Sequence, residues 1–570
     1  MYSVLRTVAV LTSARTSPES NDMPHYSNCC SFSFSILYIG FVLLYLKFIF
    51  IIGPFCITAS SSTAIHVGRI PAYCNTFPGF PSRRTAYARL RCTRMPSFSS
   101  SVATSGPTYI SSDLVPSWFR RERCRLLTTP QTSHKVQNTQ RDHGGATATA
   151  GCVIYWMQRD MRTVDNWAML LTQHLASEHF QVPMRVLYTM PPPYTVSPRP
   201  SSSSSSPPCY TNMTARHASF LLGGLQSVEE ELRELHVPFD ILFPTYETPL
   251  MSGMEIPTKM FVKSSITADV KTYVQSHQAC AIVTDFSPLR HIRDWTEEFA
   301  SAMTLDNITI PIYQVDAHNV VPVWLASNKK EVGARTLRPR IHKLLPDFLT
   351  TYPSIIGNKK DRRETAGQQQ AANSTTFESR PIIDWKKCED FLQPDVSVPP
   401  VSTWAKPGTK SGMAQFEFFC RKGLSKYSDL RNDPTQDNIC SSMSPWTNYG
   451  HVSFQTLALS IKALKVHTNA AASFLEEGIV RRELSDNFCF YCKDGYDSID
   501  GGAADWAKDS LALHERDPRE YIYTLEEFMN GETHDDLWNA AQMQVVQTGK
   551  MHGFVSMTSS LYYIQDCYLF

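Results

Sequence analysis

The stretch CVIYWMQRD, residues 152–160, is an apolar run that becomes polar at Gln158. A short apolar run closed by polar residues is typical of a strand buried on both faces of a sheet. Similar runs follow at residues 184–188, 238–243, 280–284 and 310–315. Because helical patterns such as residues 218–235 separate these runs, we expect a doubly wound parallel sheet in an α/β domain over residues 151–345.

Aspartates stand directly after three of the predicted strands, as Asp160, Asp285 and Asp316. The carboxyl ends of parallel strands form the edge at which α/β sheets bind ligands. Capping of the following helix is the simpler role for such a residue, and we favour it over ligand binding. We expect Asp165 to cap the helix that begins near Trp167. No glycine-rich phosphate loop follows the first strand, so a dinucleotide site is not expected there.

The first 150 residues differ in composition from the rest. They hold 15 Lys and Arg against 5 Asp and Glu, whereas the remaining residues hold 39 against 48. Residues 36–58 are apolar and long enough to cross a bilayer, and residues 69–125 have the Arg- and Ser-rich composition of an organellar transit peptide. We expect residues 1–150 to be a disordered, low-complexity extension outside the enzyme. Whether it serves targeting, membrane anchoring or neither stays open.

The second half of the chain shows helical patterns only. Residues 346–410, with a polar and Gln-rich centre, are expected to be a linker. Residues 411–557 are expected to form an all-α domain, and residues 558–570 an unrelated tail. The fifteen cysteines show no framework spacing, which indicates reduced thiols in an intracellular protein, in the nucleus or in an organelle.

Three helical-half segments are candidates for chemistry. In residues 426–446, hydroxyls and backbone amides beside a helix start suit a phosphate, with an ordinary loop as the alternative. Further on, Glu483 and Asn487 are four residues apart and would present a carboxylate and an amide on one helix face. That pair could bind a base edge or a flavin ring, with a solvated charged face as the alternative. On the same helix, Glu477 and Arg481 are expected to form an ion pair.

The third segment surrounds Trp538, which shares a helix face with Gln542. A tryptophan in such a position is more often a core residue than a platform for a substrate. Thr533 is expected to cap this helix. Cys489 and Cys492 form a lone pair with no second pair nearby, so no metal site is expected.

Together these segments resemble the class II cyclobutane-pyrimidine-dimer photolyases of the photolyase/cryptochrome family. The motifs keep their order and spacing from about residue 152 to residue 554: YWMQRD at 155–160, DFSPLR at 285–290, RNDP at 431–434, VRRELSDNF at 480–488, LWNAAQ at 537–542 and GKMHGF at 549–554. The resemblance implies an antenna-type α/β domain, a helical FAD-binding domain and light-driven repair of DNA.

The resemblance also implies roles for particular residues. Catalytic roles fall to Glu483, as the partner of the dimer's bases, and to Asn487 and Trp538. The implied cofactor-binding residues are Tyr427, Ser441, Met443, Ser444, Arg482, Asn539, Gln542 and Met551. The implied partner is DNA that contains cyclobutane pyrimidine dimers. A monomer without an obligate protein partner is expected, and the sequence does not identify a second, antenna chromophore.

After Phe554 the resemblance stops. Val555 begins a stretch that replaces an arginine of the family, and all ten tryptophans lie at or before Trp538. We therefore expect the helical domain to be incomplete. Two alternatives to a photolyase follow, namely a cryptochrome-like blue-light photoreceptor and a non-catalytic, truncated remnant.

Overall fold

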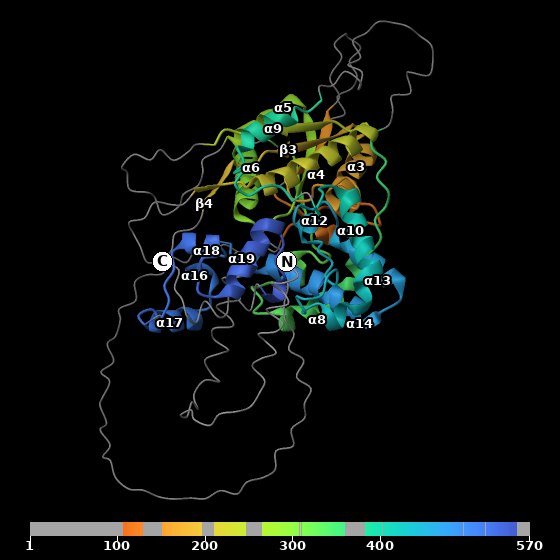
Figure 1. Cartoon of the computed structure of the whole chain (residues 1–570). Helices are drawn as coiled ribbons and strands as arrows, with labels where there is room; N and C mark the ends of the chain where they lie inside the picture. Colours follow the sequence, from red (N-terminus) through yellow and green to blue (C-terminus); the bar gives the residue numbers. More distant parts are fainter. Residues whose placement is uncertain are drawn as a thin grey trace, which may run out of the picture.

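The computed structural model describes residues 107–128, 151–196, 210–246, 265–358 and 382–555, apart from residues 307, 309, 402, 494 and 519. An α/β half lies above a helical half in Figure 1. The apolar segment 36–58, the polar centre of the predicted linker and the tail lie outside the described residues. No helix in the described part of the chain has the length and apolar character needed to cross a membrane.

The α/β half is built on a twisted sheet with the strand order β1-β8-β7-β2-β3-β6. All neighbouring pairs from β8 to β6 are parallel, which confirms the predicted doubly wound sheet. The central strand β2 is buried along its whole length, because helices cover both faces of the sheet. The parallel strands are β2 (Cys152–Met157), β3 (Met184–Thr189), β6 (Phe239–Leu242), β7 (Ala279–Asp285) and β8 (Ile312–Val315). A separate antiparallel ladder joins β4 (Tyr194–Val196) and β5 (Tyr210–Asn212).

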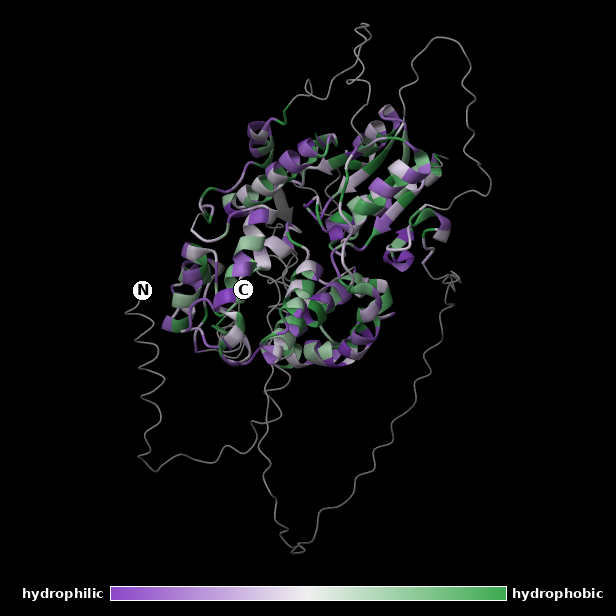
Figure 2. Ribbon diagram, turned by 90° about the vertical axis from the view of Figure 1, so that its right-hand side faces the viewer, coloured by the Kyte–Doolittle hydropathy of each residue, from purple (hydrophilic) through white to green (hydrophobic). Residues whose placement is uncertain are grey.

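Alternate residues of β2 point into two different cores. Val153 and Tyr155 pack with the helices α3 (Trp167–His174) and α4 (Ala215–Glu234), whereas Ile154 packs with the helices on the other face. Those helices are α5 (Ile266–Ser276) and α6 (Arg290–Leu305). Figure 2 shows that the covering helices carry both hydrophilic and hydrophobic residues, as expected for amphipathic helices.

The start of α3 corrects one expectation. Asn166, not Asp165, caps this helix by accepting the backbone N–H groups of Ala168 and Met169. Asp165 has a positive φ of 53° and accepts a hydrogen bond from the hydroxyl of Thr456 instead. The turn before α3 is therefore one residue longer than the pattern suggested.

Part of the predicted N-terminal extension belongs to the α/β half, so its boundary at residue 150 was wrong. β1 (Cys124–Leu126) pairs antiparallel with β8 at the edge of the sheet. The strand has only three residues, and the charged residues Arg121, Arg123 and Arg125 around it hid its apolar character. Two of these side chains lie over aromatic rings, Arg123 over Trp167 and Arg125 over Trp324, which allows the charges to be buried.

The predicted linker was also drawn too widely. Its second part contains α9 (Trp385–Leu392), whose Cys388 and Leu392 are fully buried in the core of the α/β half. The indole of Trp385 donates to Glu229 on α4 at 2.9 Å. At the other end, α8 (Ala334–Phe348) packs into the core of the helical half, so that half begins before residue 345.

The helical half is all-α within the described residues, as predicted. Residues 468–491 form one continuous helical run in which a π-helical segment, η7 (Glu476–Arg481), separates α14 (Thr468–Leu475) from α15 (Arg482–Tyr491). The other helices are α7 (Val323–Ala326), α10 (Thr409–Lys422), α11 (Tyr427–Leu430), α12 (Ser444–Asn448), α13 (Phe454–Leu464), α16 (Ile499–Gly502), α17 (Asp505–Leu513), α18 (Leu525–Asn530) and α19 (Asp536–Thr548).

Two glycines allow α4 to approach the helical half closely. A Cβ atom on Gly224 would lie 1.9 Å from the imidazole of His451, and one on Gly223 would lie 2.3 Å from Pro407. Neither position can carry a larger side chain without moving the two halves apart.

Candidate functional site

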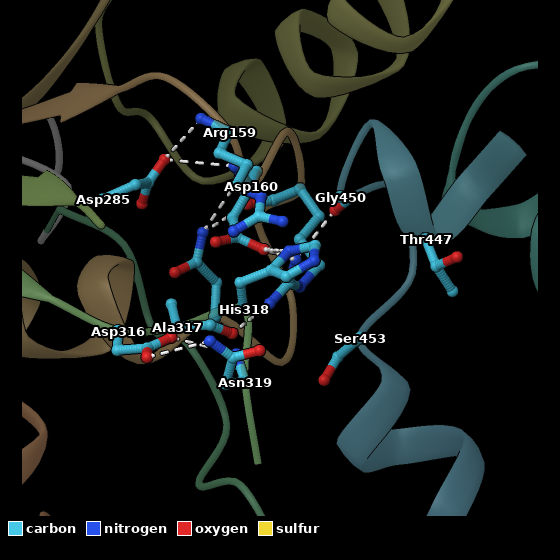
Figure 3. Close-up of polar contacts among 12 residues, drawn as sticks. Arg159, Asp160, Asp285, Asp316, Ala317, His318, Asn319, Thr447, Gly450 and Ser453 are labelled. Carbon is cyan, nitrogen blue, oxygen red and sulfur yellow. Dashed lines mark hydrogen bonds and ion pairs between the residues drawn. The ribbon is translucent and has the colours of Figure 1, made fainter. Parts of the chain in front are cut away.

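The two halves of the molecule meet at the carboxyl ends of β2, β7 and β8, where three aspartates are fully buried. Figure 3 shows their surroundings. One oxygen of Asp285 accepts the backbone N–H groups of Gln158, Arg159 and Asp160 at 2.9–3.1 Å, and the other accepts the hydroxyl of Tyr155. Burial and the nearby Asp160 raise the pKa of Asp285 above its ordinary value. Asp285 thus holds the turn after β2 and caps no helix.

Asp160 lies in an ionic cluster. Its carboxylate pairs with the guanidinium of Arg162, and Nδ1 of His318 lies 3.4 Å away. Burial works to raise the pKa of Asp160, but Arg162 and His318 outweigh it and hold that pKa well below its ordinary value. Burial lowers the pKa of His318 to about 3, so this imidazole is neutral at pH 7.

Asp316 shapes the loop after β8, which we call the 316–321 loop. Its carboxylate accepts the backbone N–H groups of Asn319 and Val323 and the side-chain amide of Asn319. The same amide of Asn319 also donates to Asp486 on α15 at 2.9 Å. The 316–321 loop therefore connects the α/β half to α15.

A bidentate ion pair adds a second link between the halves. Both terminal nitrogens of Arg159 donate to Asp486, at 2.7 and 3.0 Å. Burial would raise the pKa of Asp486, but Arg159 lowers it to about 2. Because paired guanidinium and carboxylate groups are directional, this pair fixes the rotation of α15 as well as its distance from β2.

Arg482 and Glu483 each bind the 316–321 loop through one end only. Glu483 Oε1 accepts the backbone N–H groups of Val320 and Val321, at 2.6 and 3.4 Å, and Arg482 Nη2 donates to the carbonyl of His318 at 2.9 Å. Glu483 Oε2 and Arg482 Nη1 are buried with no hydrogen-bond partner among the described residues. Burial raises the pKa of Glu483 to about 8. These two groups, on consecutive residues, therefore have hydrogen-bonding capacity that the described residues do not use.

Glu483 and Asn487 share a helix face, as the spacing predicted, but this face is not solvated. Asn487 is fully buried, accepts the backbone N–H of Glu331 and donates to the carbonyl of Lys329. Both polar ends of its amide thus bind the loop that precedes α8. The catalytic role of Asn487 stays a prediction.

The π-helical segment corrects another expectation. Glu477 does not pair with Arg481 but with Arg431, at 2.7 Å, and both side chains are buried. Arg481 instead lies 3.5 Å from Glu476. In a π-helix the repeat is longer than 3.6 residues, so side chains four apart no longer stand above one another. Only the apolar residues two and three positions away, Phe474, Leu475, Ile479 and Val480, signalled the burial of Glu477, and its pair with Arg431 was not predicted.

Tyr427 lies beside this ion pair, and three further implied cofactor residues follow it on the segment 441–444. Tyr427 and Met443 are buried in the core of the helical half; the ring of Tyr427 lies 6.0 Å from that of Phe474 and beneath the guanidinium of Arg431. Ser441 is buried and Ser444 begins α12. This group, which we call the Tyr427 cluster, combines hydroxyls, a buried cation and an aromatic wall.

The implied residues of α19 make their polar contacts elsewhere. Asn539 bonds in both directions with Thr533, at 2.7–2.9 Å, and Gln542 donates to the carbonyl of Met529. Trp538 packs edge-on against Phe528, with the ring centroids 5.4 Å apart. α18 and α19 are thus a locally bonded pair. The roles of these residues in a cofactor site stay predictions.

The start and the end of α19 add two observations. Asp535, not Thr533, caps the helix by accepting the N–H groups of Leu537 and Trp538. Beyond the helix, half-buried Met551 is followed by His552, whose imidazole lies 3.9 Å from the thiol of Cys440. The chain after α19 therefore returns to the segment that holds Ser441.

Comparisons with known proteins agree with this arrangement. The family model for DNA photolyase matches residues 153–356. The chain is 38% identical over 440 residues to the deoxyribodipyrimidine photo-lyase of Potorous tridactylus, an alignment that covers 77% of this chain and 69% of that protein. It is 35% identical to the Arabidopsis thaliana protein of that name, with 72% and 73% covered, and 33% identical to that of Oryza sativa subsp. japonica, with 73% of each covered. The chain therefore belongs to the DNA photolyase family.

Proposed function

We propose that this protein is a class II deoxyribodipyrimidine photolyase, which uses FAD and blue light to split cyclobutane pyrimidine dimers in DNA. The observation that carries the proposal is the identity of 38% to a deoxyribodipyrimidine photo-lyase over 440 residues, a span longer than either half of this molecule. The buried unpartnered groups of Arg482 and Glu483 add support, because they lie where the two halves meet.

The residues of the Tyr427 cluster fit FAD. Its phosphates require cations and hydroxyls, which Arg431, Ser441 and Ser444 supply, and its planar ring requires a dry apolar wall, which Tyr427 and Met443 supply. When bound and reduced, FAD supplies the photoexcited electron that opens the dimer, whereas the protein binds, orients and excludes water.

Glu483 suits contact with a pyrimidine. With a pKa of about 8 the side chain is mostly protonated at pH 7. A protonated carboxyl has one O–H donor, and Oε1 is already occupied by the backbone of the 316–321 loop. Oε2 can therefore donate to a base carbonyl. Arg482 Nη1, on the preceding residue, is a second buried donor without a partner among the described residues, and it carries a positive charge.

The DNA backbone would contact a basic surface next to α15. Exposed cations lie on α8 and on the loop before it, namely Lys329, Lys330, Arg335 and Lys343. The backbone of this loop binds Asn487 on α15. Such a patch attracts phosphates although the folded part of the chain is net acidic. The dimer itself would leave the base stack to reach the interior, as in other enzymes that act on a base.

The test uses the full chain, FAD and an oligonucleotide with one cyclobutane dimer. Repair that requires both light and FAD is the expected result, with a dark sample as the control. Glu483→Ala, which removes the group that would donate to the base, should retain FAD and lose at least about tenfold in repair; the exposed Glu526→Ala is the matched control. Absence of light-dependent repair contradicts the proposal. FAD binding without any affinity for dimer-containing DNA would favour the photoreceptor alternative.

A further inference from the structure

Arg123 lies in the segment that the sequence placed outside the enzyme, yet its side chain is fully buried between the two halves. The guanidinium donates to three backbone carbonyls of the 316–321 loop, those of Asp316 at 2.7 Å, Asn319 at 2.8 Å and Val320 at 2.6 Å. Few side chains other than arginine can serve three acceptors in one plane. Arg123 therefore fixes the conformation of this loop.

Glu483 binds the same two peptide groups from the other side. The first group consists of the carbonyl of Asn319 and the N–H of Val320; Arg123 binds the carbonyl and Glu483 binds the N–H. The second consists of the carbonyl of Val320 and the N–H of Val321, which the same two side chains bind in the same way. Because the C=O and N–H of a trans peptide point in opposite directions, Arg123 and Glu483 lie on opposite sides of the loop.

This arrangement is electrostatically cooperative. A cation at the oxygen end and a carboxyl group at the N–H end both align with the peptide dipole, and hydrogen bonds in such a chain strengthen one another. Water is excluded from both ends, since Arg123 and Glu483 are each 2% exposed. Loss of Arg123 would leave three buried carbonyls without their donor.

Aromatic rings hold Arg123 itself in place. Its guanidinium carbon lies 5.4 Å from the ring of Trp167 on α3 and 5.3 Å from that of Phe348 on α8. The neighbouring Glu122 accepts the indole N–H of Trp324 through its backbone carbonyl. The segment around β1 therefore contacts both halves at the place where α15 packs against the 316–321 loop.

We propose that Arg123 is a positioning residue for the active site: through the two peptide groups of the 316–321 loop it sets the position of Glu483 and is coupled to it electrostatically, and it thereby sets the position of α15. The role of Arg123 in the active site rests on the proposed function, whereas its coupling to Glu483 does not.

The coupling can be measured without any activity, by a double-mutant cycle of thermal unfolding midpoints for the full chain. The cycle comprises the wild type, Arg123→Gln, Glu483→Gln and the double variant, at pH 6 and pH 9. Glutamine at position 123 keeps a donor for the loop but carries no charge. Other charged or titratable groups around Glu483 stay constant in all four proteins: Arg159, Asp160, Asp316, His318, Arg482 and Asp486.

At pH 9 Arg123→Gln should lower the unfolding midpoint more with Glu483 present than in the Glu483→Gln background, because the carboxylate has lost one of its neighbouring cations and keeps only Arg482. At pH 6, where Glu483 is protonated, the cost should be nearly the same in both backgrounds. The control is Arg120→Gln, because Arg120 is an exposed residue of the same segment and pairs with exposed Asp347. Its effect on the unfolding midpoint should add to that of Glu483→Gln at both pH 6 and pH 9. Equal non-additivity at pH 6 and pH 9 would show a merely structural role and overturn the inference.

Arg123→Lys provides the second variant, because it keeps the charge but cannot span three carbonyls. It should preserve the pH dependence of the unfolding midpoint and still lose at least about tenfold in light-dependent repair, while Arg120→Gln repairs like the wild type. Repair by Arg123→Lys at the wild-type rate contradicts the positioning role. If the wild type itself shows no repair, the proposed function fails, but the unfolding cycle still decides the coupling.

Discussion

α15 and α19 both carry motifs of the family, but they are held in different ways. The polar side chains of α15 bind residues far away in the chain: Asp486 bonds with Asn319 and Arg159, separated from it by 167 and 327 positions. The polar side chains of α19 bind close neighbours, such as Asn539 with Thr533, six positions away. The position of α15 is therefore a property of the whole fold, whereas α18 and α19 form a local unit.

The difference shows that a motif identifies a family without identifying what holds its residues in place. Around α15 the ion pair of Asp486 with Arg159 is buried, so removal of one partner leaves the other uncompensated. Around α19 the side chains are half exposed, and lost contacts are replaced by water. Perturbations of the two regions should therefore differ in size and in extent.

The largest effect is expected from removal of the β1 segment. Deletion of residues 1–128 removes β1 and Arg123, which exposes the edge of β8 and leaves three loop carbonyls buried without a donor. We expect no cooperative thermal transition by circular dichroism. Deletion of residues 1–106 is the matched control, because it keeps every described contact. Identical melting curves for the two deletions would show that β1 and Arg123 are not needed for cooperative folding, and would contradict this prediction.

Asp486→Asn should have the next largest effect. The substitution breaks the bidentate pair with Arg159 and leaves a buried guanidinium unpaired, which costs about 3–5 kcal/mol. Urea unfolding measures this loss. The control is Asp505→Asn, because Asp505 is exposed and pairs with Lys508 on the surface of α17, so that its loss should change the free energy of unfolding much less. Equal costs for the two substitutions would contradict the comparison of buried and exposed regions.

A pH dependence should follow from Glu483. Its pKa is raised by burial to about 8 in the folded protein, so the folded state binds its proton more tightly than the unfolded state does. The associated stability is fully present below about pH 4.5 and is lost as the pH rises to about 8. Relative to wild type, Glu483→Gln should therefore gain on the order of a few kcal/mol between pH 5 and pH 9. A constant difference between the two proteins over this range would exclude the raised pKa.

The smallest effect is expected on α19. Asn539→Ala removes the bonds to Thr533 and should cost about 1 kcal/mol. Because the pair is local, limited proteolysis between α18 and α19 should become faster while the main thermal transition stays in place. A shift of the main transition as large as that of Asp486→Asn would show that α19 is coupled to the whole fold.

The sheet could be predicted from the sequence because β2 is buried on both faces and therefore wholly apolar. β1 could not, because its three residues stand among arginines whose burial depends on partners such as Trp167 and Trp324. The shared face of Glu483 and Asn487 followed from helical spacing.

The pairing of Glu477 did not follow from spacing, because the π-helical segment changes the repeat at the place where that rule was applied. The position of α15 did not follow from the sequence either, because it depends on contacts between distant residues, such as that of Arg159 with Asp486.

The most direct test of this account is hydrogen–deuterium exchange of the full chain with and without FAD. The account predicts that amides of α15 exchange slowest in the helical half, that amides of α18 and α19 exchange much faster, and that FAD slows exchange in α11, α12 and the run from α14 to α15. Exchange in α15 as fast as in α19, or exchange at these segments that FAD leaves unchanged, would contradict it.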